Sequence, residues 1–151
     1  MQDLICTKTT KNRGVGVFAT RDIRKDEIIA EFIGPVVMIK SLEGIPREVQ
    51  DHLYNAGIGK YIIAKEPAAR TNHSCDPNAG IKNDVYLVAM RNIKKDEEVT
   101  FDYSIITNDG WTLKCACGAK SCRKLIGNYK DLPETFKQRY KDYTPDWIKQ
   151  I

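Results

Sequence analysis

Three cysteines lie close together in the last third of the chain, at positions 115, 117 and 122. A disulfide between two of them would be strained by the short spacing, whereas thiolates are good ligands for Zn²⁺ in tetrahedral structural sites. Three thiolates leave one coordination position, for which Cys75 is the best candidate and His73 the alternative. We therefore predict a structural zinc ion held by Cys75, Cys115, Cys117 and Cys122.

Glycines and polar side chains elsewhere could bind a small ligand. In the segment GVG at residues 14–16, the two glycines lack a Cβ atom and let a ligand approach the backbone closely, although taken alone they would indicate a hairpin turn. Asn72 and His73 offer an amide group and a flat ring side by side. A protease-like pair of His73 and Cys75 is disfavoured, because sequence neighbours rarely meet as base and nucleophile and no orienting residue is evident. We therefore discount a thiol hydrolase.

A repeated charged segment indicates the strands that must position these residues. Residues 19–29 (ATRDIRKDEII) match residues 89–99 (AMRNIKKDEEV) at several positions, and each copy separates two β-rich stretches. We predict two similar strand–turn–strand corners, with strands at 16–19, 27–32, 85–90 and 98–103. Tyr103 falls at the end of the last of these strands.

The remaining segments predict a short internal helix and a C-terminal one. Residues 46–55 (PREVQDHLYN) begin with a proline suited to a first helical turn, and residues 61–64 predict another short strand. Aromatic residues at 136, 140, 143 and 147 recur at helical spacing, which predicts a C-terminal helix packed on the core. Many short strands and few helices make the predicted fold class mainly β or α+β.

The composition fits one soluble globular domain of 151 residues. Of the residues, 42% are apolar and 29% charged, and the longest apolar stretch, residues 32–39, is too short to cross a membrane. The net charge of +4 is mild and spread among mixed signs, which argues against direct nucleic-acid binding. The first six residues (MQDLIC) lack the pattern of a secretory signal, so we expect a reducing compartment and, by default, the cytoplasm.

Four segments, in this order, resemble the motifs of SET-domain protein-lysine N-methyltransferases. Residues 13–16 (RGVG) resemble the N-terminal motif of the family, NHSCDPN at 72–78 its central motif, and EVTFDY at 98–103 its later signature. Residues 114–127 (KCACGAKSCRKLIG) are similar to the post-SET segment, in which three cysteines share a zinc ion with the NHSC cysteine. The resemblance covers about residues 12–127, without a cysteine-rich pre-SET region before residue 13.

The resemblance implies a SET-domain (β-clip-like) fold of several small sheets with a pseudoknot, short helices and a C-terminal helix. It implies three parts of the chain. These are a SET domain at residues 1–112 with a variable insert at about 36–66, a post-SET zinc-binding segment at 113–128, and a C-terminal helical extension at 129–151.

The resemblance also implies an activity, the transfer of methyl groups from S-adenosylmethionine to a lysine of a protein substrate such as a histone or chromatin protein. The substrate would bind as an extended strand beside an exposed sheet edge, and chromatin targets make a nuclear location the alternative to the cytoplasm. The implied catalytic residue is Tyr103, whose hydroxyl orients the methyl donor and the amine, while Asp102 is expected to hold local structure. The residues implied for cofactor binding are Arg13, Gly14, Val15, Gly16, Tyr54, Asn72 and His73.

Two phenylalanines fall in the implied substrate channel. Phe32 stands where many members carry the tyrosine of a Y-x-G motif, so a hydroxyl that contacts lysine in those proteins is missing here. Phe101 occupies a position that varies between Phe and Tyr, and phenylalanine leaves room for more than one methyl group, which predicts di- or trimethylation. Phe32 keeps a non-catalytic SET-like peptide-binding module as the alternative function, against which Asn72, His73 and Tyr103 argue. A zinc-stabilised nucleic-acid binder rests only on the mild charge.

Overall fold

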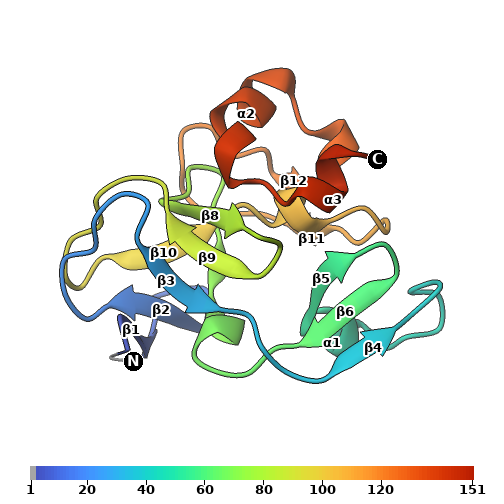
Figure 1. The fold of residues 1–151 in the computed structure, drawn as a ribbon, viewed down its shortest axis with the longest axis horizontal. Coiled ribbons are helices and arrows are strands. Elements are labelled where there is room, and N and C mark those ends of the chain that lie inside the picture. The colour runs from blue at the N-terminus through green and yellow to red at the C-terminus, as the bar shows by residue number, and fades with distance from the viewer. Residues whose placement is uncertain (1–2) are drawn as a thin grey trace.

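Short strands dominate the computed structural model, which describes residues 3–151 (Figure 1). The strands are β1 (Ile5–Thr9), β2 (Val15–Ala19), β3 (Ile28–Glu31), β4 (Val36–Met38), β5 (Leu53–Gly57), β6 (Lys60–Ile63), β7 (Asn72–His73), β8 (Ala79–Lys82), β9 (Tyr86–Ala89), β10 (Glu98–Phe101), β11 (Leu113–Lys114) and β12 (Leu125–Ile126). The helices are α1 (Arg47–Gln50), α2 (Glu134–Arg139) and α3 (Asp146–Lys149), with 3₁₀ turns η1 (Ala68–Arg70), η2 (Tyr103–Ile106), η3 (Tyr129–Asp131) and η4 (Lys141–Tyr143).

The strands form four small sheets. Their orders are β1-β2-β10-β7, β3-β9-β8, β4-β6-β5 and β11-β12. Most neighbouring strands are antiparallel, but β7 runs parallel to β10 and pairs His73 with Phe101. Since β10 also pairs antiparallel with β2, the segments 14–16, 72–78 and 98–103 meet in one sheet although they lie far apart in the chain. The predicted fold of several small sheets with few helices is confirmed.

The repeated charged segments form two corners that face each other. Ile23 and Ile93 sit at equivalent positions and pair in an antiparallel bridge, exchanging backbone hydrogen bonds of 2.7 and 2.8 Å. Each corner turns through an aspartate with positive φ, 70° at Asp26 and 71° at Asp96. Each is also closed by an ion pair, Arg21–Glu27 in one and Arg91–Glu97 in the other. The sequence repeat therefore marks a local two-fold arrangement that fixes the relation between β2, β3, β9 and β10.

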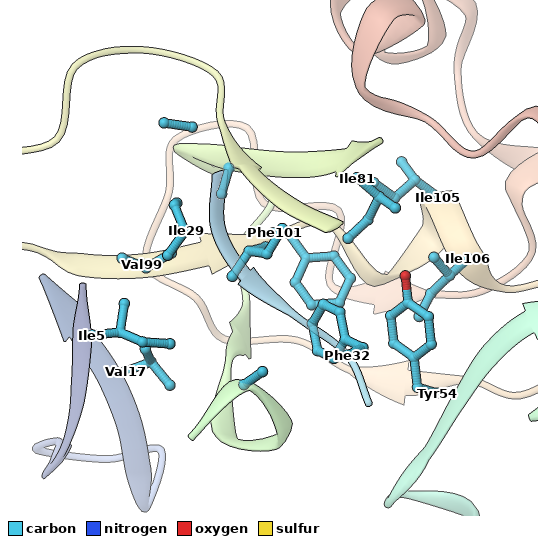
Figure 2. Close-up of a cluster of buried hydrophobic side chains, with 14 of the residues drawn as sticks. Ile5, Val17, Ile29, Phe32, Tyr54, Ile81, Val99, Phe101, Ile105 and Ile106 are labelled. Atoms are coloured by element: carbon cyan, nitrogen blue, oxygen red, sulfur yellow. The ribbon is translucent and has the colours of Figure 1, made fainter. Parts of the chain in front are cut away.

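The hydrophobic core joins the sheets. Figure 2 shows Ile5, Val17 and Val99 on one side of it and the rings of Phe32, Phe101 and Tyr54 gathered on the other. The Phe32 and Tyr54 rings are stacked with centroids 4.2 Å apart, and Phe101 meets Phe32 edge-on at 5.8 Å. Burial of such rings stabilises a fold through both area and ring geometry. The core thereby ties β5 of one sheet to β3 and β10 of two others.

The internal helix is shorter than predicted. Residues 46–55 were expected to be helical, but α1 ends at Gln50 and β5 begins at Leu53. In β5, Tyr54 pairs with Ile62 of β6, and both are buried. Strand pairing and burial therefore override the local helix preference in the second half of the segment.

The C-terminal segment, residues 134–149, forms two short helices with a 3₁₀ turn between them in place of one continuous helix. Pro145 precedes α3, and the residue before it, Thr144, is extended at φ −119° and ψ 135°. A residue before proline is disfavoured in the helical region of φ and ψ, which explains the break between η4 and α3. Tyr140 and Tyr143 are buried as the aromatic spacing predicts. The segment covers one end of the molecule, and η4 packs on β8 (Figure 1).

Within residues 3–151, no helix has both the length and the apolar character needed to cross a membrane.

Candidate active site and metal centre

An ion pair holds the glycine loop against the central sheet. The Arg13 guanidinium donates to Oε1 of Glu98 at 2.5 Å and to the carbonyl oxygen of His73 at 2.9 Å. The other carboxylate oxygen of Glu98 accepts from Asn72 Nδ2 at 3.0 Å, and the same amide donates to the carbonyl of Val15 at 3.2 Å. The resemblance implies cofactor binding for Arg13, Val15, Asn72 and His73, and these residues are linked here. Glu98 joins Arg13 to Asn72, which contacts Val15, and Arg13 also contacts His73.

The two glycines of the loop are required for different reasons. Gly14 has a φ of +64°, a left-handed conformation that glycine adopts without steric cost, and a Cβ atom there would meet nothing within 4 Å. A Cβ atom on Gly16 would lie 2.6 Å from Glu98 Oε2 and 3.0 Å from Asn72 Nδ2. Gly16 thus permits the close approach of β2 to the Glu98–Asn72 pair, and Gly14 leaves open space beside the loop.

The ring of His73 is buried and links two parts of the site. Its Nδ1 accepts the backbone N–H of Tyr103 at 3.0 Å, and its Nε2 lies 3.3 Å from Sγ of Cys75. Burial lowers the pKa of His73 to about 4, against the opposing influence of the Asp102 carboxylate. A neutral ring with Nδ1 as acceptor carries its proton on Nε2. The His73 ring is therefore fixed in place and neutral near pH 7, and it does not take up a proton from solution there.

Tyr103 begins the η2 turn, and one residue separates it from the end of β10. Its hydroxyl donates to the carbonyl oxygen of Thr71 at 2.6 Å. Burial raises the pKa of Tyr103 well above its ordinary value, so the hydroxyl stays protonated near neutral pH. The ring lies 5.3 Å from that of His73 and 5.0 Å from that of Phe101. A protonated, fixed hydroxyl can position a reacting group but cannot serve as a general base.

An aromatic cavity of about 90 Å³ lies beside Tyr103. Its walls include the rings of Phe32, Tyr54, Phe101, Tyr103 and Trp111. Tyr54, expected at the cofactor, stacks on Phe32 in this wall, and its hydroxyl already donates to the carbonyl of Asp84 at 2.7 Å. These aromatic walls suit the aliphatic part of a lysine side chain.

Side chains from α1 and from the segment before β11 meet at this cavity. Trp111 Nε1 donates to Oδ1 of Asp51 at 3.0 Å, and Arg47 Nε donates to the same oxygen at 2.7 Å. The Arg47 guanidinium also lies over the Trp111 ring, 5.1 Å from its centroid, and donates to the carbonyl of Thr112 at 2.6 Å. Two segments about sixty residues apart thus form one wall of the cavity.

Four cysteine sulfurs converge on one point. The Sγ atoms of Cys75, Cys115, Cys117 and Cys122 all lie within 4.8 Å of one another, with Cys75 and Cys115 4.0 Å apart. Zinc–sulfur bonds of about 2.3 Å place the ligands of a tetrahedron about 3.8 Å apart, so these sulfurs fit a zinc ion with small adjustment. Cys75, rather than His73, completes the set. The cluster could hold the predicted zinc ion.

Sequence reasoning missed several residues that organise the site. Glu98 lies inside the EVTFDY segment, yet its role depends on contacts with Arg13 and Asn72 that no local pattern reveals. No local sequence pattern links Asp51 to Trp111, because 60 positions separate them. Arg123 directly follows the last cysteine, and its ion pair with Asp102, at 2.8 Å, appears only in the folded chain.

Comparison with known proteins gives consistent results. The family model of the SET domain matches residues 14–104. The histone-lysine N-methyltransferase trr of Drosophila melanogaster is 34% identical over 135 residues, which cover 78% of this chain and 6% of that protein. The chain therefore spans only a small part of this relative.

Two solved structures share the fold. Arabidopsis thaliana SUVH6 in complex with SAM is 22% identical with a TM-score of 0.65, covering 82% of this chain and 33% of that one. KRYPTONITE in complex with mCHH DNA, an H3(1-15) peptide and SAH is 22% identical with a TM-score of 0.64, covering 83% and 30%.

Proposed function

The chain belongs to the SET-domain family, and we propose on this basis that it is a protein-lysine N-methyltransferase using S-adenosylmethionine. One observation carries the proposal. The glycine loop, Asn72 and His73 adjoin Tyr103, and Tyr103 in turn forms part of an aromatic cavity suited to a lysine side chain. A site for a methyl donor and a site for an amine thus meet at one tyrosine.

The residues around the glycine loop have the chemistry to hold the cofactor. S-adenosylmethionine, when bound, supplies an electrophilic methyl group on a sulfonium. The backbone of residues 14–16 has open space beside Gly14, and Asn72 and His73 present amide and ring groups next to it. We propose that these groups bind the cofactor and that Arg13 and Tyr54 support its binding, Arg13 through the loop and Tyr54 through the cavity wall. Arg13 acts by fixing the loop, since its guanidinium is already held by Glu98 and His73.

Methyl transfer to an amine requires alignment more than acid–base catalysis. The amine must be neutral, so its proton leaves to water before transfer; a positive charge nearby, such as a sulfonium, favours that loss. The protonated Tyr103 hydroxyl is fixed by Thr71, and it orients the reacting groups. Positioning of this kind supplies about 7–11 kcal/mol in favourable cases. Phe32 and Phe101 add no hydroxyl to the cavity, which leaves room for more than one methyl group.

We propose that the four cysteines hold a structural zinc ion that fastens the post-SET segment to the SET domain. Cys75 follows β7, and the other three ligands lie in the loop that joins β11 to β12. We propose accordingly that the chain has three parts: a SET domain at 1–112, a post-SET segment with three zinc ligands at 113–128, and a C-terminal extension at 129–151. The zinc ion contributes folding energy rather than chemistry.

We propose a lysine in a basic histone tail as the substrate. The relative named above is a histone-lysine methyltransferase, and the KRYPTONITE complex contains an H3 peptide. In this chain, Asp51 and Asp109 both line the cavity. The Asp51 carboxylate is paired with Arg47, whereas that of Asp109 forms no ion pair within residues 3–151 and attracts a basic peptide. This proposal favours a chromatin location over the cytoplasmic default, which the comparisons do not support.

Titration calorimetry with S-adenosylmethionine, followed by transfer of labelled methyl groups to a pool of histones, tests the function. We expect binding in the wild type, loss of binding in His73→Ala, and loss of transfer in Tyr103→Phe. His52→Ala, which changes the other histidine of the chain at the proposed lysine cavity, is the control for cofactor binding alone and not for transfer. Binding without transfer to any histone would favour the peptide-binding module. Absence of cofactor binding in the wild type would overturn the proposal.

A further inference from the structure

The carboxylate of Asp102 is completely enclosed and is held from three different segments. The residue is 1% exposed and immediately precedes Tyr103. Its Oδ1 accepts from the backbone N–H of Ser104 at 3.0 Å and from the Arg123 guanidinium at 2.8 Å. Its Oδ2 accepts from the hydroxyl of Tyr140 at 3.1 Å. A buried carboxylate needs such partners, because an unpaired charge in the interior is strongly unfavourable.

The contact with Ser104 makes Asp102 the cap of the η2 turn. Tyr103 is the first residue of that turn, so its backbone direction follows from the position of the Asp102 carboxylate. The N–H of Tyr103 is meanwhile held by Nδ1 of His73, and its hydroxyl by the carbonyl of Thr71. A shift of Asp102 would therefore tilt Tyr103 against two fixed partners.

The C-terminal extension provides one of the groups that hold this carboxylate. Tyr140, directly after α2, is 1% exposed, and its ring brings the hydroxyl to Asp102 from a part of the chain 38 positions away. The same extension places Phe136 under the Arg123 guanidinium, 4.6 Å from the ring centroid. Residues 129–151, which the sequence predicts only as a helical extension packed on the core, thus supply the neutral partner of Asp102 and a contact of its cationic partner.

We infer that Tyr140 is a positioning residue of the methyl-transfer site, acting through Asp102 on Tyr103. The inference rests on the proposed methyl-transfer function. Removal of the Tyr140 hydroxyl would leave Oδ2 of Asp102 without a partner in an enclosed site, and the η2 turn would relax to satisfy it. A displacement of about 1 Å at a reacting group costs about 100-fold in rate in sensitive cases.

The chain supplies a matched control in Tyr143. This tyrosine belongs to the same C-terminal segment, is also buried, and also donates its hydroxyl to an aspartate carboxylate. Its acceptor, Asp26, has a side chain that is 55% exposed and lies in the first charged corner, away from Tyr103. The variants Tyr140→Phe and Tyr143→Phe therefore each delete a hydrogen bond from a buried tyrosine to an aspartate, but only Tyr140→Phe touches Asp102. Tyr140→Phe also removes a longer contact, 3.5 Å, from the same hydroxyl to the carbonyl of Cys75, so the zinc content of both variants is measured as well.

The test measures steady-state methyl transfer and amide hydrogen exchange in both variants. For Tyr140→Phe we expect kcat to fall about tenfold or more, with the KM for a histone peptide and the Kd for S-adenosylmethionine within about twofold of the wild type. Exchange of the Tyr103 and Ser104 amides should accelerate about tenfold, while that of Ile93 stays unchanged. Tyr143→Phe should leave all of these values near those of the wild type.

Several results would overturn the inference. They are an unchanged kcat in Tyr140→Phe, an equal loss in Tyr143→Phe, or equal acceleration of exchange at Ile93, which would indicate general loosening of the fold. Arg123→Gln removes the cationic partner of the same carboxylate, and it should give the same pattern with a larger loss of kcat. If the wild type transfers no methyl group, the proposed function fails, and the exchange measurements still decide whether Tyr140 fixes the turn at Tyr103.

Discussion

Nε2 of His73 lies 3.3 Å from Sγ of Cys75, while Nδ1 of the same ring accepts the backbone N–H of Tyr103. A single buried imidazole therefore contacts a proposed zinc ligand on one side and the proposed catalytic residue on the other. Because the two nitrogens belong to one rigid ring, a displacement of one moves the other. We expect disturbance of the metal centre to reach the methyl-transfer site.

Loss of one zinc ligand tests this link. Cys115→Ser should abolish the bound zinc, lower the melting temperature and eliminate methyl transfer, because the free energy of metal binding is part of the folding free energy of such segments. Metal analysis and thermal unfolding, with and without a strong chelator, measure the effect. Cys6→Ser is the control, since Cys6 lies in β1 outside the cluster. Retention of full zinc content by Cys115→Ser would contradict the assignment.

Neutralising Glu98 should weaken cofactor binding. Glu98→Gln keeps the size of the side chain but removes the charge that holds Arg13 and accepts from Asn72. We expect the Kd for S-adenosylmethionine to rise about tenfold, as measured by calorimetry, since hydrogen bonds to charged groups are the stronger ones. Glu27→Gln removes the exposed ion pair with Arg21 and should change the Kd little. Equal affinity in both variants would show that Glu98 does not organise the loop.

The indole of Trp111 should matter for the peptide more than for the cofactor. Trp111→Phe deletes the hydrogen bond from Nε1 to Asp51 and loosens the wall of the cavity. We expect the KM for a histone peptide to rise about fivefold with kcat and cofactor affinity within about twofold. Trp147→Phe is matched, because Nε1 of Trp147 has no hydrogen-bond partner among the described residues. An equal rise in KM in both variants would show that the Trp111–Asp51 hydrogen bond is not needed for peptide binding at the cavity.

A hydroxyl placed at position 101 should change the product. The ring of Phe101 lies 5.0 Å from that of Tyr103 and is 3% exposed, so an added hydroxyl would enter a confined space beside the amine. We expect di- and trimethyl-lysine from the wild type and mainly monomethyl-lysine from Phe101→Tyr, measured by mass spectrometry at saturating cofactor. Phe18→Tyr, on β2, should not alter the product. Monomethyl-lysine alone from the wild type would refute the prediction.

Much of the site could be predicted because its components are local in sequence. The spacing of Cys115, Cys117 and Cys122 indicates a metal site, since thiolate chemistry limits what such a cluster can do. The two corners are visible as a repeat, and their strands lie close to the β-rich stretches that flank it. The helix predicted at 46–55 was partly wrong, because pairing of β5 with β6 and burial of Tyr54 outweigh local propensity.

The sequence by itself determined the ligand chemistry, the mainly β character and the family motifs, because these depend on residue type and short spacing. Only the tertiary structure decided which distant side chains support them. Arg13 meets Glu98 across 85 positions, Asp51 meets Trp111 across 60, and Asp102 meets Tyr140 across 38. Such contacts arise from the packing of whole sheets around one core, and no periodicity within a segment encodes them.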